Sequence, residues 1–309
     1  MKRISIVIPV YNEEKNIQPL FAMLNSVMED LKVRYWVELI FVNDGSEDET
    51  LRMLESLENP AYKIKIINLS RNFGQQNALK AGYDHSIGDA VICMDGDLQN
   101  PAHTVLEMIS LWEAGYEVVI AKRKKGMQRS GYFKDISSRL FYKVLNNISE
   151  VKVEPNTPDF RLIDRKVVKE LNLFKERELF YRGIVSWIGF KKVIIEYEHQ
   201  KREKGKSSYN ILKMMRLGLA GVTGFSTKPL YLSLLLGIFI IGIAFTAIIY
   251  AIVVHSLGQT ISGWTSLIIA VMFFGGVQLF FLGIIGLYIG KIFNQVKGRP
   301  YYIVESTID

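Results

Sequence analysis

Two long uncharged runs near the carboxyl terminus constrain the fold of this chain more than any other feature. Residues 229–254 and 266–290 contain no Asp, Glu, Lys or Arg. Each run exceeds the roughly 20 apolar residues that cross a bilayer core, and neither lies where an N-terminal signal peptide would. The pattern predicts two transmembrane helices, because two buried core helices would need a large soluble layer around them that this chain lacks.

Positive charge is unevenly distributed around the two runs, and this predicts their orientation. The joining segment, residues 255–265, has no Lys or Arg, whereas basic residues precede the first run and follow the second. The positive-inside tendency therefore places both termini in the cytoplasm and the joining segment outside. Gly286 and Gly290 form a pair of small residues that permits close helix approach. Self-association as a homo-oligomer and the ordinary glycine content of membrane helices both stay open.

The segment 208–228, which leads into the first run, is predicted to form amphipathic helices at the membrane interface. Its first ten residues are largely apolar, and Lys213 and Arg216 are three positions apart on one side. A basic edge of this kind suits the anionic head groups of membrane lipid. A helix that packs on the soluble domain is the alternative interpretation.

The residues before position 208 alternate between short apolar runs and helical periodicity. Strands are expected at residues 4–8, 37–42, 62–69, 90–94 and 117–121, and a helix is expected at 14–31. This alternation predicts an α/β fold with a mainly parallel sheet and helices on both faces. The single cysteine, Cys93, lies in one of these strands, which excludes an intrachain disulfide and indicates a buried, inert thiol.

Polar residues follow the expected strands at the point where each strand ends. Because ligands bind beyond the carboxyl ends of parallel strands, the carboxylates after the first, second and fourth strands should converge. Asp95 and Asp97 follow the fourth strand and are separated by one glycine. Such a pair suits Mg²⁺ or Mn²⁺, which takes its remaining ligands from water and substrate phosphates. An ordinary Asp-Gly turn is the alternative.

Several functional classes are not supported by the motifs. No G-x-G-x-x-G follows the first strand, which argues against a dinucleotide oxidoreductase. Gly205-Lys206-Ser207 resembles the end of a Walker A loop, but Gln200 stands where the first glycine is required. The sequence also has no H-E-x-x-H and no paired-cysteine zinc spacing.

Basic residues form two clusters within an overall formal charge of +7. Residues 121–143 hold eight Lys or Arg and one acid, and residues 201–216 hold six and one. Such clusters favour an anionic partner, and a lipid monophosphate at the membrane surface is one such anion. Solvated basic faces on anionic lipid are the alternative. The membrane anchor argues against nucleic acid as the partner.

Several motifs together resemble the GT-A glycosyltransferases of family 2. They are Ile8-Pro9-Val10-Tyr11-Asn12-Glu13-Glu14, Val42-Asn43-Asp44-Gly45-Ser46, Asn72-Phe73-Gly74, Asp95-Gly96-Asp97-Leu98-Gln99-Asn100-Pro101 and Thr157-Pro158-Asp159-Phe160-Arg161-Leu162. Together with the Lys228-Pro229-Leu230 entry to the uncharged runs, they are similar to the dolichol-phosphate-mannose-synthase-like polyprenyl-phosphate glycosyltransferases. Within that branch the chain is most similar to bacterial bactoprenol glucosyltransferases of the GtrB type.

The resemblance covers nearly the whole chain and implies its organisation. Residues 1–207 would form a cytoplasmic, Rossmann-like GT-A domain, followed by the amphipathic segment 208–228. Residues 229–290 would form a two-helix transmembrane hairpin, and residues 291–309 a cytoplasmic tail. The protein would thus be a multi-pass protein of the bacterial cytoplasmic membrane.

The resemblance also implies roles for the matching residues. The nucleotide sugar would be bound by Pro9, Tyr11, Glu13, Asp44, Asp95 and Arg123, with Asp44 accepting a hydrogen bond from the uracil N–H. Asp95 and Asp97 would hold Mg²⁺ or Mn²⁺, and Asp159 matches the aspartate usually named as catalytic. The acceptor phosphate would be met by Arg139, Arg202, Lys206 and Ser207.

The implied reaction is an inverting, metal-dependent transfer of a sugar from a UDP-sugar to undecaprenyl or another polyprenyl phosphate, for cell-envelope glycosylation. Glucose is the first choice of sugar, and UDP-N-acetylglucosamine or another nucleotide sugar stays open. A phosphate monoester has its second pKa at about 6 and hardly needs a general base at pH 7. Asp159 is therefore expected to orient the sugar or to stabilise positive character at the anomeric carbon.

Two other functional classes fit the sequence less well than this reaction. A processive polysaccharide synthase is disfavoured, because two spans provide no long set of channel-forming helices. A non-catalytic membrane scaffold on the same fold is disfavoured because the four expected aspartates are intact, namely Asp44, Asp95, Asp97 and Asp159.

Overall fold

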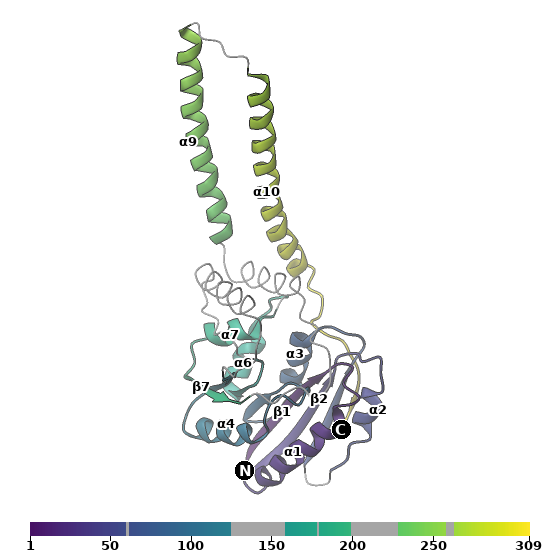
Figure 1. Cartoon of the computed structure of the whole chain (residues 1–309). Helices are drawn as coiled ribbons and strands as arrows, with labels where there is room; N and C mark the ends of the chain where they lie inside the picture. The colour runs from purple at the N-terminus through teal and green to yellow at the C-terminus, as the bar shows by residue number, and fades with distance from the viewer. Residues whose placement is uncertain (60–61, 125–157, 178, 199–227, 258–262) are drawn as a thin grey trace. The chain divides into compact units, whose positions relative to one another are not determined.

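The computed structural model describes residues 1–59, 62–124, 158–177, 179–198, 228–257 and 263–309. The chain divides into two compact units, and we describe each by itself. The first unit contains the described residues up to position 198 together with Arg299–Asp309. The second contains the described residues from 228 to 298. Figure 1 shows the elements of both units.

An eight-stranded sheet forms the centre of the first unit, in the order β7-β5-β6-β4-β1-β2-β3-β8. Its strands are β1 (Lys2–Val10), β2 (Tyr35–Asn43), β3 (Lys63–Leu69), β4 (Ala90–Cys93), β5 (Val118–Arg123), β6 (Arg161–Asp164), β7 (Lys192–Tyr197) and β8 (Val304–Ile308). β1 pairs in parallel with β2 and β4, β2 with β3, and β5 with β7. The prediction of five strands from the apolar runs is confirmed by β1 to β5. The strands β6, β7 and β8 were not expected.

Six of the eight described strands run in one direction, which confirms a mainly parallel sheet, while β6 and β8 run opposite to them and make the sheet mixed. β6 lies between β4 and β5 and runs opposite to both, with Cys93 of β4 opposite Arg161 of β6. β4 and β5 therefore point the same way, and their carboxyl ends share an edge with the start of β6. Asp159 lies two positions before that start, so the antiparallel strand delivers it to the edge where β1, β2 and β4 end.

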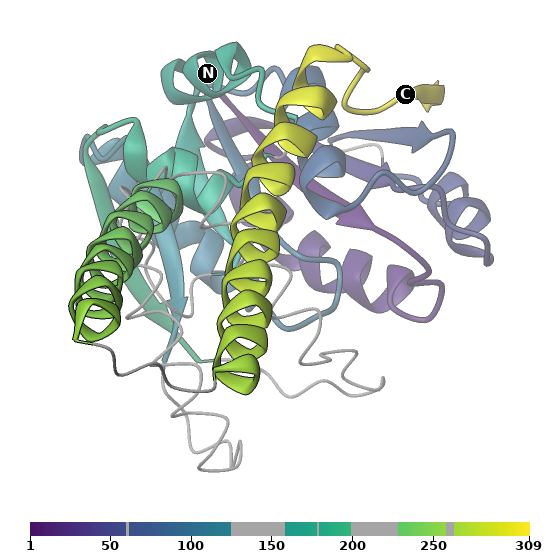
Figure 2. The ribbon, with the colours of Figure 1, turned by 90° about the horizontal axis from the view of Figure 1, so that it is seen from above.

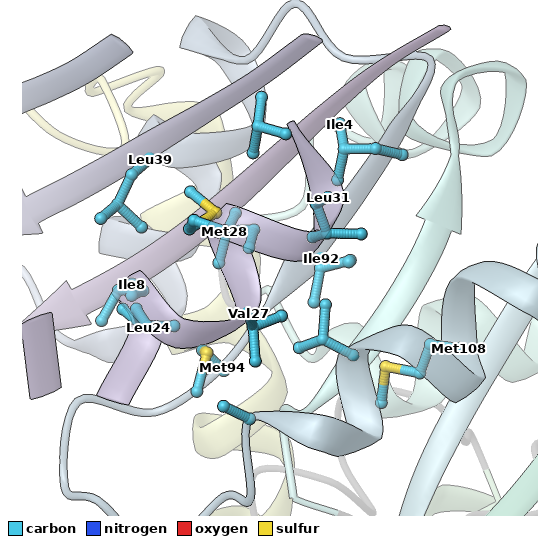
Figure 3. Packing of buried hydrophobic residues seen from close by; sticks show 14 of the residues in the cluster. Ile4, Ile8, Leu24, Val27, Met28, Leu31, Leu39, Ile92, Met94 and Met108 are labelled. Carbon is cyan, nitrogen blue, oxygen red and sulfur yellow. The ribbon is translucent and has the colours of Figure 1, made fainter. Parts of the chain in front are cut away.

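Helices cover both faces of the sheet, as the alternation predicted. They are α1 (Ile17–Leu31), α2 (Thr50–Glu55), α3 (Gln75–His85), α4 (His103–Glu113), α6 (Arg165–Leu173) and α7 (Tyr181–Trp187). Figure 3 shows Leu24 and Met28 of α1 packed with Ile4 and Ile8 of β1 in the main hydrophobic cluster, to which α4 also contributes.

α3 packs on the opposite face of the sheet. Successive side chains of a strand point to opposite faces, so Val7 of β1 faces away from the cluster that contains its neighbours. Gly82 of α3 approaches Val7 so closely that a Cβ on this glycine would lie 2.1 Å from Val7 Cγ1. α6 in turn packs against α3. The close approach fixes α3, whose first turn reaches the carboxyl edge of the sheet.

The carboxyl-terminal residues return to the sheet of the first unit. β8 pairs antiparallel with β3, and the Ser70 backbone N–H donates to the Ile303 carbonyl oxygen at 3.0 Å. The Arg177 guanidinium donates to the Pro300 carbonyl oxygen at 2.6 Å. The tail expected as a separate segment over residues 291–309 therefore supplies an edge strand to the sheet.

The second unit contains α9 (Lys228–Ser256) and α10 (Trp264–Val296), which lie side by side (Figures 1 and 2). The two uncharged runs are thus helical. Within the described residues, one stretch, Phe273–Val296, is long and apolar enough to cross a membrane, and α9 holds the shorter apolar stretch Ser233–Thr246. The two-helix transmembrane hairpin is therefore not established by the structure. The amphipathic segment expected at 208–228 lies outside the described residues, except for its last position.

Candidate active site

The candidate active site begins at the turn after β4. Gly96 packs against the end of β1, where a Cβ on it would lie 2.9 Å from Val10 Cγ1 and 3.4 Å from the Pro9 carbonyl oxygen. A side chain at this position would push the two strand ends apart. Glycine therefore allows Asp95 and Asp97 to stand at the carboxyl edge of β4, directly beside the end of β1.

Asp95 is partly buried and accepts a hydrogen bond from the Gln75 side-chain amide at 2.7 Å. Burial, together with the neighbouring Asp159 and Asp97 carboxylates, raises the pKa of Asp95 to about 7, against the lowering effect of Arg182 and Arg123. Negative charge at Asp95 is thus incompletely balanced by the protein. A bound cation would supply the missing positive charge.

The donor set at this turn fits a hard divalent ion that is shared with a substrate. Within the described parts of the chain, no three His, Cys, Asp or Glu side chains gather as a metal-binding group. Asp95 and Asp97, on either side of Gly96, offer a pair of carboxylates, and their role as metal ligands stays a prediction. Magnesium-like ions use such pairs when water and substrate phosphates complete their coordination.

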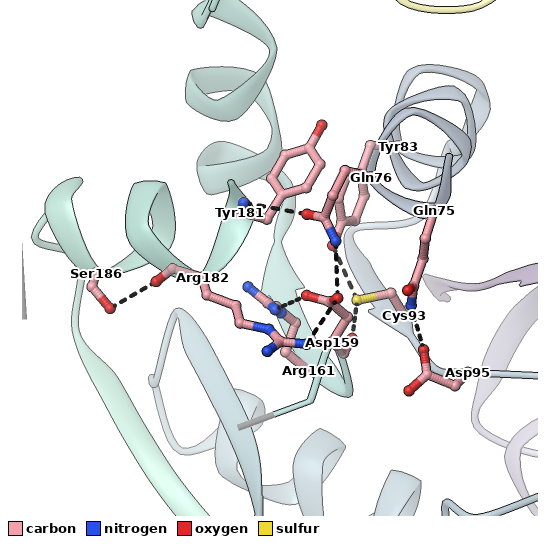
Figure 4. A network of polar contacts seen from close by, with 10 residues as sticks. All are labelled: Gln75, Gln76, Tyr83, Cys93, Asp95, Asp159, Arg161, Tyr181, Arg182 and Ser186. Atoms are coloured by element: carbon pink, nitrogen blue, oxygen red, sulfur yellow. Dashed lines mark hydrogen bonds and ion pairs between the residues drawn. The ribbon is translucent and has the colours of Figure 1, made fainter. Parts of the chain in front are cut away.

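Asp159 lies at the centre of a polar network to which three elements, α3, β6 and α7, contribute side chains (Figure 4). Its Oδ2 accepts from the Gln76 amide at 3.0 Å and from Arg182 Nη2 at 3.4 Å. Its Oδ1 pairs with Arg161 Nη2 in a short, buried contact. The Gln76 side-chain oxygen in turn accepts from the Tyr181 backbone N–H at 3.4 Å. α3, β6 and α7 thereby all hold one carboxylate.

The two arginines keep Asp159 ionised. Burial alone would raise the pKa of this carboxyl, which is only 2% exposed, but Arg182 and Arg161 outweigh it and lower the pKa overall. Arg161 is itself buried, whereas the Arg182 side chain is 29% exposed. An anion held in this way is a poor proton acceptor. This arrangement fits the expectation that Asp159 orients or stabilises charge rather than removing a proton.

Cys93 connects β4 to the Asp159 loop. Its Sγ donates to the Asp159 carbonyl oxygen at 2.7 Å and accepts from the Tyr83 hydroxyl at 3.0 Å. Burial raises the pKa of the Cys93 thiol to about 11, so it stays protonated at neutral pH. The prediction of a buried thiol is confirmed, and its role here is to hold the loop that carries Asp159.

Asp44 is engaged by the backbone of the β3–α3 loop. Its carboxylate oxygens accept from the Phe73 N–H at 2.7 Å and the Gly74 N–H at 2.9 Å, and the residue is 3% exposed. Burial raises the pKa of Asp44, and the two amides oppose this effect. Asp44 thus fixes the loop that leads into Gln75 and Gln76, the first two residues of α3. Its expected contact with uracil stays a prediction.

The loops after β1 and β2 are tied to each other at the same edge. Asn12 adopts a positive φ of 53°, and its backbone N–H donates to Ser46 Oγ at 2.9 Å. The Glu13 N–H donates to Thr50 Oγ1 at 2.8 Å. The Tyr11 side chain is 41% exposed beside these contacts. Tyr11 and Glu13 therefore stand on a fixed loop directly after Pro9 and Val10 of β1, and the nucleotide-binding roles of Pro9, Tyr11 and Glu13 stay predictions.

Arg123 ends β5 on the far side of the site. Its Nε donates to the Tyr197 hydroxyl at 3.3 Å, and that hydroxyl donates to the Asn100 side-chain oxygen at 3.0 Å. Arg123 lowers the pKa of Asp95, so it contributes positive potential to the same edge. The remaining residues expected to bind a phosphate lie outside the described residues: Arg139, Arg202, Lys206 and Ser207.

Sequence reasoning missed four residues of the network: Gln75, Gln76, Arg161 and Arg182. Gln75 and Gln76 directly follow the Asn72-Phe73-Gly74 motif, and Arg161 stands two positions after Asp159 within a quoted motif. All three residues could therefore have been found from those motifs. Arg182 has no such signal, because 23 positions separate it from Asp159 and α7 brings the two together.

Comparisons with known proteins identify the family of the chain. The profile of the family described as Glycosyl transferase family 2 matches residues 5–172. An uncharacterized glycosyltransferase of Bacillus subtilis, YkcC, is 43% identical over 98% of this chain and 93% of its own length. A bactoprenol glucosyl transferase of Shigella phage SfX is 40% identical over 98% of this chain and 99% of its own length.

Among solved structures, the mannosyltransferase PcManGT from Pyrobaculum calidifontis has a similar fold. The TM-score is 0.51 with 16% sequence identity, and the match covers 72% of this chain and 63% of that chain. At this level of identity the likeness concerns the fold alone. It agrees with the GT-A architecture expected for the first unit, a mixed sheet with flanking helices.

Proposed function

The chain belongs to glycosyl transferase family 2 and is a glycosyltransferase, and from this premise we propose that it transfers a sugar from a UDP-sugar to a polyprenyl phosphate. The proposal rests on one observation above all. A relative named bactoprenol glucosyl transferase matches nearly the full length of both chains at 40% identity. Bactoprenol is a polyprenol, so undecaprenyl phosphate is the first choice of acceptor and glucose the first choice of sugar.

The proposed reaction is a single displacement with inversion at the anomeric carbon. A bond forms between that carbon and an oxygen of the lipid phosphate, and the bond to the donor β-phosphate oxygen breaks, releasing UDP. The acceptor phosphate is largely dianionic at pH 7, with its second pKa at about 6, and needs little help from a base. The ionised Asp159 is positioned to stabilise positive character at the anomeric carbon.

Asp95 and Asp97 would hold Mg²⁺ or Mn²⁺, which supplies charge neutralisation of the departing diphosphate. The chain's own residues do the remaining work at this edge. Gln75 fixes the orientation of the Asp95 carboxylate through its 2.7 Å hydrogen bond. The turn at Gly96 keeps both carboxylates beside the end of β1, where Pro9 of the strand and Tyr11 and Glu13 of the following loop would bind the nucleotide.

Two anionic substrates must meet at this edge, and arginines are placed to hold them. Arg123 and Arg182 both bring positive potential to Asp95, and both are partly exposed. Arg139, Arg202, Lys206 and Ser207 are proposed to meet the acceptor phosphate. Charge-assisted hydrogen bonds from arginine to phosphate are short, and those from a planar guanidinium are often bidentate.

The proposed location is the bacterial cytoplasmic membrane, with two spans and both termini in the cytoplasm. The apolar stretch Phe273–Val296 and the uncharged run of α9 support the two spans. The lack of Lys and Arg in residues 255–265 supports the orientation. A polyprenyl phosphate resides in such a membrane, so the acceptor and the enzyme would occupy the same surface.

Incubation of the purified full-length chain with undecaprenyl phosphate and separate UDP-sugars tests the proposal. Mass analysis of the lipid fraction should find undecaprenyl phosphate extended by one hexose when UDP-glucose and Mg²⁺ or Mn²⁺ are present. The Asp97→Asn variant, purified in the same way, is the matched control and should give little product. If only a hexosamine adduct is found, the transferred sugar is a hexosamine and not glucose. If the protein binds the UDP-sugar but forms no glycolipid, the result would support the scaffold alternative and overturn the proposal.

A further inference from the structure

α6 and α7 end in a small apolar surface that the fold leaves uncovered. Leu173 ends α6 and is 68% exposed, and Trp187 ends α7 and is 64% exposed. Phe174 joins them, because its ring packs edge-on against the Trp187 ring with the centroids 5.7 Å apart. We propose that this surface of Leu173, Phe174 and Trp187 contacts the lipid bilayer, an inference that rests on the membrane location proposed above.

The core of the first unit does not account for this surface. α6 already buries Val167, Val168 and Leu171. Leu173 comes two positions after Leu171 and points away from that buried face, into solvent. A single exposed apolar residue is ordinary, but contiguous ones typically mark a surface that meets a partner. Full burial of a Leu side chain is worth about 1.5–3 kcal/mol, and Leu173, at 68% exposure, gains little of this from the described residues.

The path of the chain identifies the partner. The Tyr301 hydroxyl donates to the Phe174 carbonyl oxygen at 3.2 Å, and Arg177 donates to the Pro300 carbonyl oxygen at 2.6 Å. Tyr301 is only five positions beyond Val296, which ends the stretch able to cross a membrane. Five residues reach at most about 18 Å. The surface is therefore tethered close to the point where the span ends.

The side chains at this surface have the chemistry of a membrane interface. Trp is enriched at the level of the head groups, where its ring is apolar and its N–H is polar. Lys175, which follows Phe174, is exposed and is suited to anionic head groups. An apolar surface with a basic neighbour matches segments that lie in the interface rather than those that bind another protein domain.

The position of the surface also bears on how the acceptor would enter the site. α7 carries Arg182, which contacts Asp159, and ends at Trp187 five positions later. At 1.5 Å per residue this is about 7.5 Å along the helix axis. A bilayer against Trp187 would thus bring lipid head groups to the side of α7 that reaches the candidate site. A lipid phosphate could then approach Asp159 while its chain stays in the membrane.

A fluorescent probe at residue 173 tests the contact without reference to activity. The full-length Leu173→Cys variant, labelled with an environment-sensitive dye, is reconstituted into vesicles of phosphatidylglycerol and phosphatidylcholine. Val33→Cys is the matched control, because Val33 is 76% exposed and follows α1 on the opposite face of the sheet. Cys93 is fully buried, and unmodified protein treated with the dye serves as the blank.

The dye at residue 173 should emit at shorter wavelength than the dye at residue 33, and lipids with nitroxide-labelled chains should quench it selectively. If aqueous iodide quenches both dyes equally and nitroxide lipids quench neither, the contact does not exist.

Trp187→Glu adds a functional measure, with Val33→Glu as its control. It should slow transfer to undecaprenyl phosphate in vesicles and leave UDP binding unchanged. Selective quenching in a protein that makes no glycolipid would support the surface and overturn only the proposed function.

Discussion

Asp95 and Asp159 stand at the same edge of the sheet, yet their surroundings shift their pKa values in opposite directions. Asp159 contacts two arginines and the Gln76 amide, and its pKa is lowered despite burial. Asp95 contacts the Gln75 amide, and burial together with the neighbouring carboxylates raises its pKa to about 7. Neighbouring acids whose pKa values are driven apart in this way usually have different tasks.

The difference indicates which carboxylate has its positive counter-charge supplied by the protein and which one does not. The protein has already supplied the counter-charges of Asp159 through Arg161 and Arg182. At Asp95 the nearby arginines do not offset burial and the neighbouring carboxylates, so its pKa stays raised. We infer that Asp159 acts as a fixed anion toward the sugar, and that the Asp95 pair takes its counter-charge from outside the chain, as a divalent cation bound with the donor diphosphate.

Replacing Asp159 by Asn breaks the comparison most severely. Arg161 would lose its buried anionic partner, and breaking a buried ion pair costs about 3–5 kcal/mol. Loss of a positioned charge in an active site typically lowers turnover by about 10²–10³-fold. We therefore expect both a lower Tm and a severe loss of sugar transfer, measured by scanning fluorimetry and by product formation. A variant that is destabilised but transfers at the normal rate would remove Asp159 from the chemistry.

Asp97→Asn should separate catalysis from stability. Asp97 is partly exposed in the turn after β4 and contributes little to the core. We expect a Tm close to that of the unaltered chain and a loss of transfer of about 10²–10³-fold, as for other removed electrostatic contacts. Titration of Mg²⁺ and Mn²⁺ should show that the residual rate needs more metal. Full activity in excess chelator would contradict the metal role of the pair.

Arg182→Ala tests whether the exposed arginine of the Asp159 network also contacts a substrate phosphate. A hydrogen bond to a charged group contributes about 1.5–3 kcal/mol, or about ten- to a hundredfold in affinity. We expect kcat/KM to fall by that factor, and Arg182→Lys to recover it only in part, because lysine cannot donate in a planar fork. Arg34→Ala is the control, since Arg34 pairs with Glu113 at the surface. Equal effects of Arg182→Ala and Arg34→Ala would leave Arg182 without a substrate contact.

Much of the fold could be predicted from the apolar pattern, but three strands, β6, β7 and β8, were not predicted. The first five strands are buried runs of Val, Ile and Leu, which local sequence reveals. β8 is an edge strand with mostly exposed residues, so its sequence lacks that signal, whereas β7 is an edge strand that was missed although it carries the apolar run Val193-Ile194-Ile195. β6 is only four residues long. Its place between β4 and β5 depends on long-range pairing that no local pattern encodes.

The candidate site could be predicted in part for the same reason. Asp44, Asp95 and Asp97 follow strands directly, so the rule for parallel strand ends finds them. Asp159 required the family resemblance, because an antiparallel strand carries it to the edge. Gln76 and Arg182 enter the site from helices, through contacts of 3.0 and 3.4 Å with Asp159 that only the tertiary structure defines.

The smallest expected effect is a dependence of stability on pH, and it distinguishes the two carboxylates directly. The pKa of Asp95 rises from an ordinary 3.8 to about 7 on folding, so the folded state favours its protonated form. This contribution to stability is complete below pH 3.8 and is lost as the pH rises to about 7. In chelator, Asp95→Asn should therefore raise the Tm most above pH 7 and leave it unchanged near pH 4, as scanning fluorimetry would measure.

Asp159 has a lowered pKa, so its contribution is present at neutral pH and fades in acid. The destabilisation by Asp159→Asn should therefore shrink as the pH falls. Parallel pH profiles for the two variants would mean that the carboxylates share one environment, and the division of roles between them would fail.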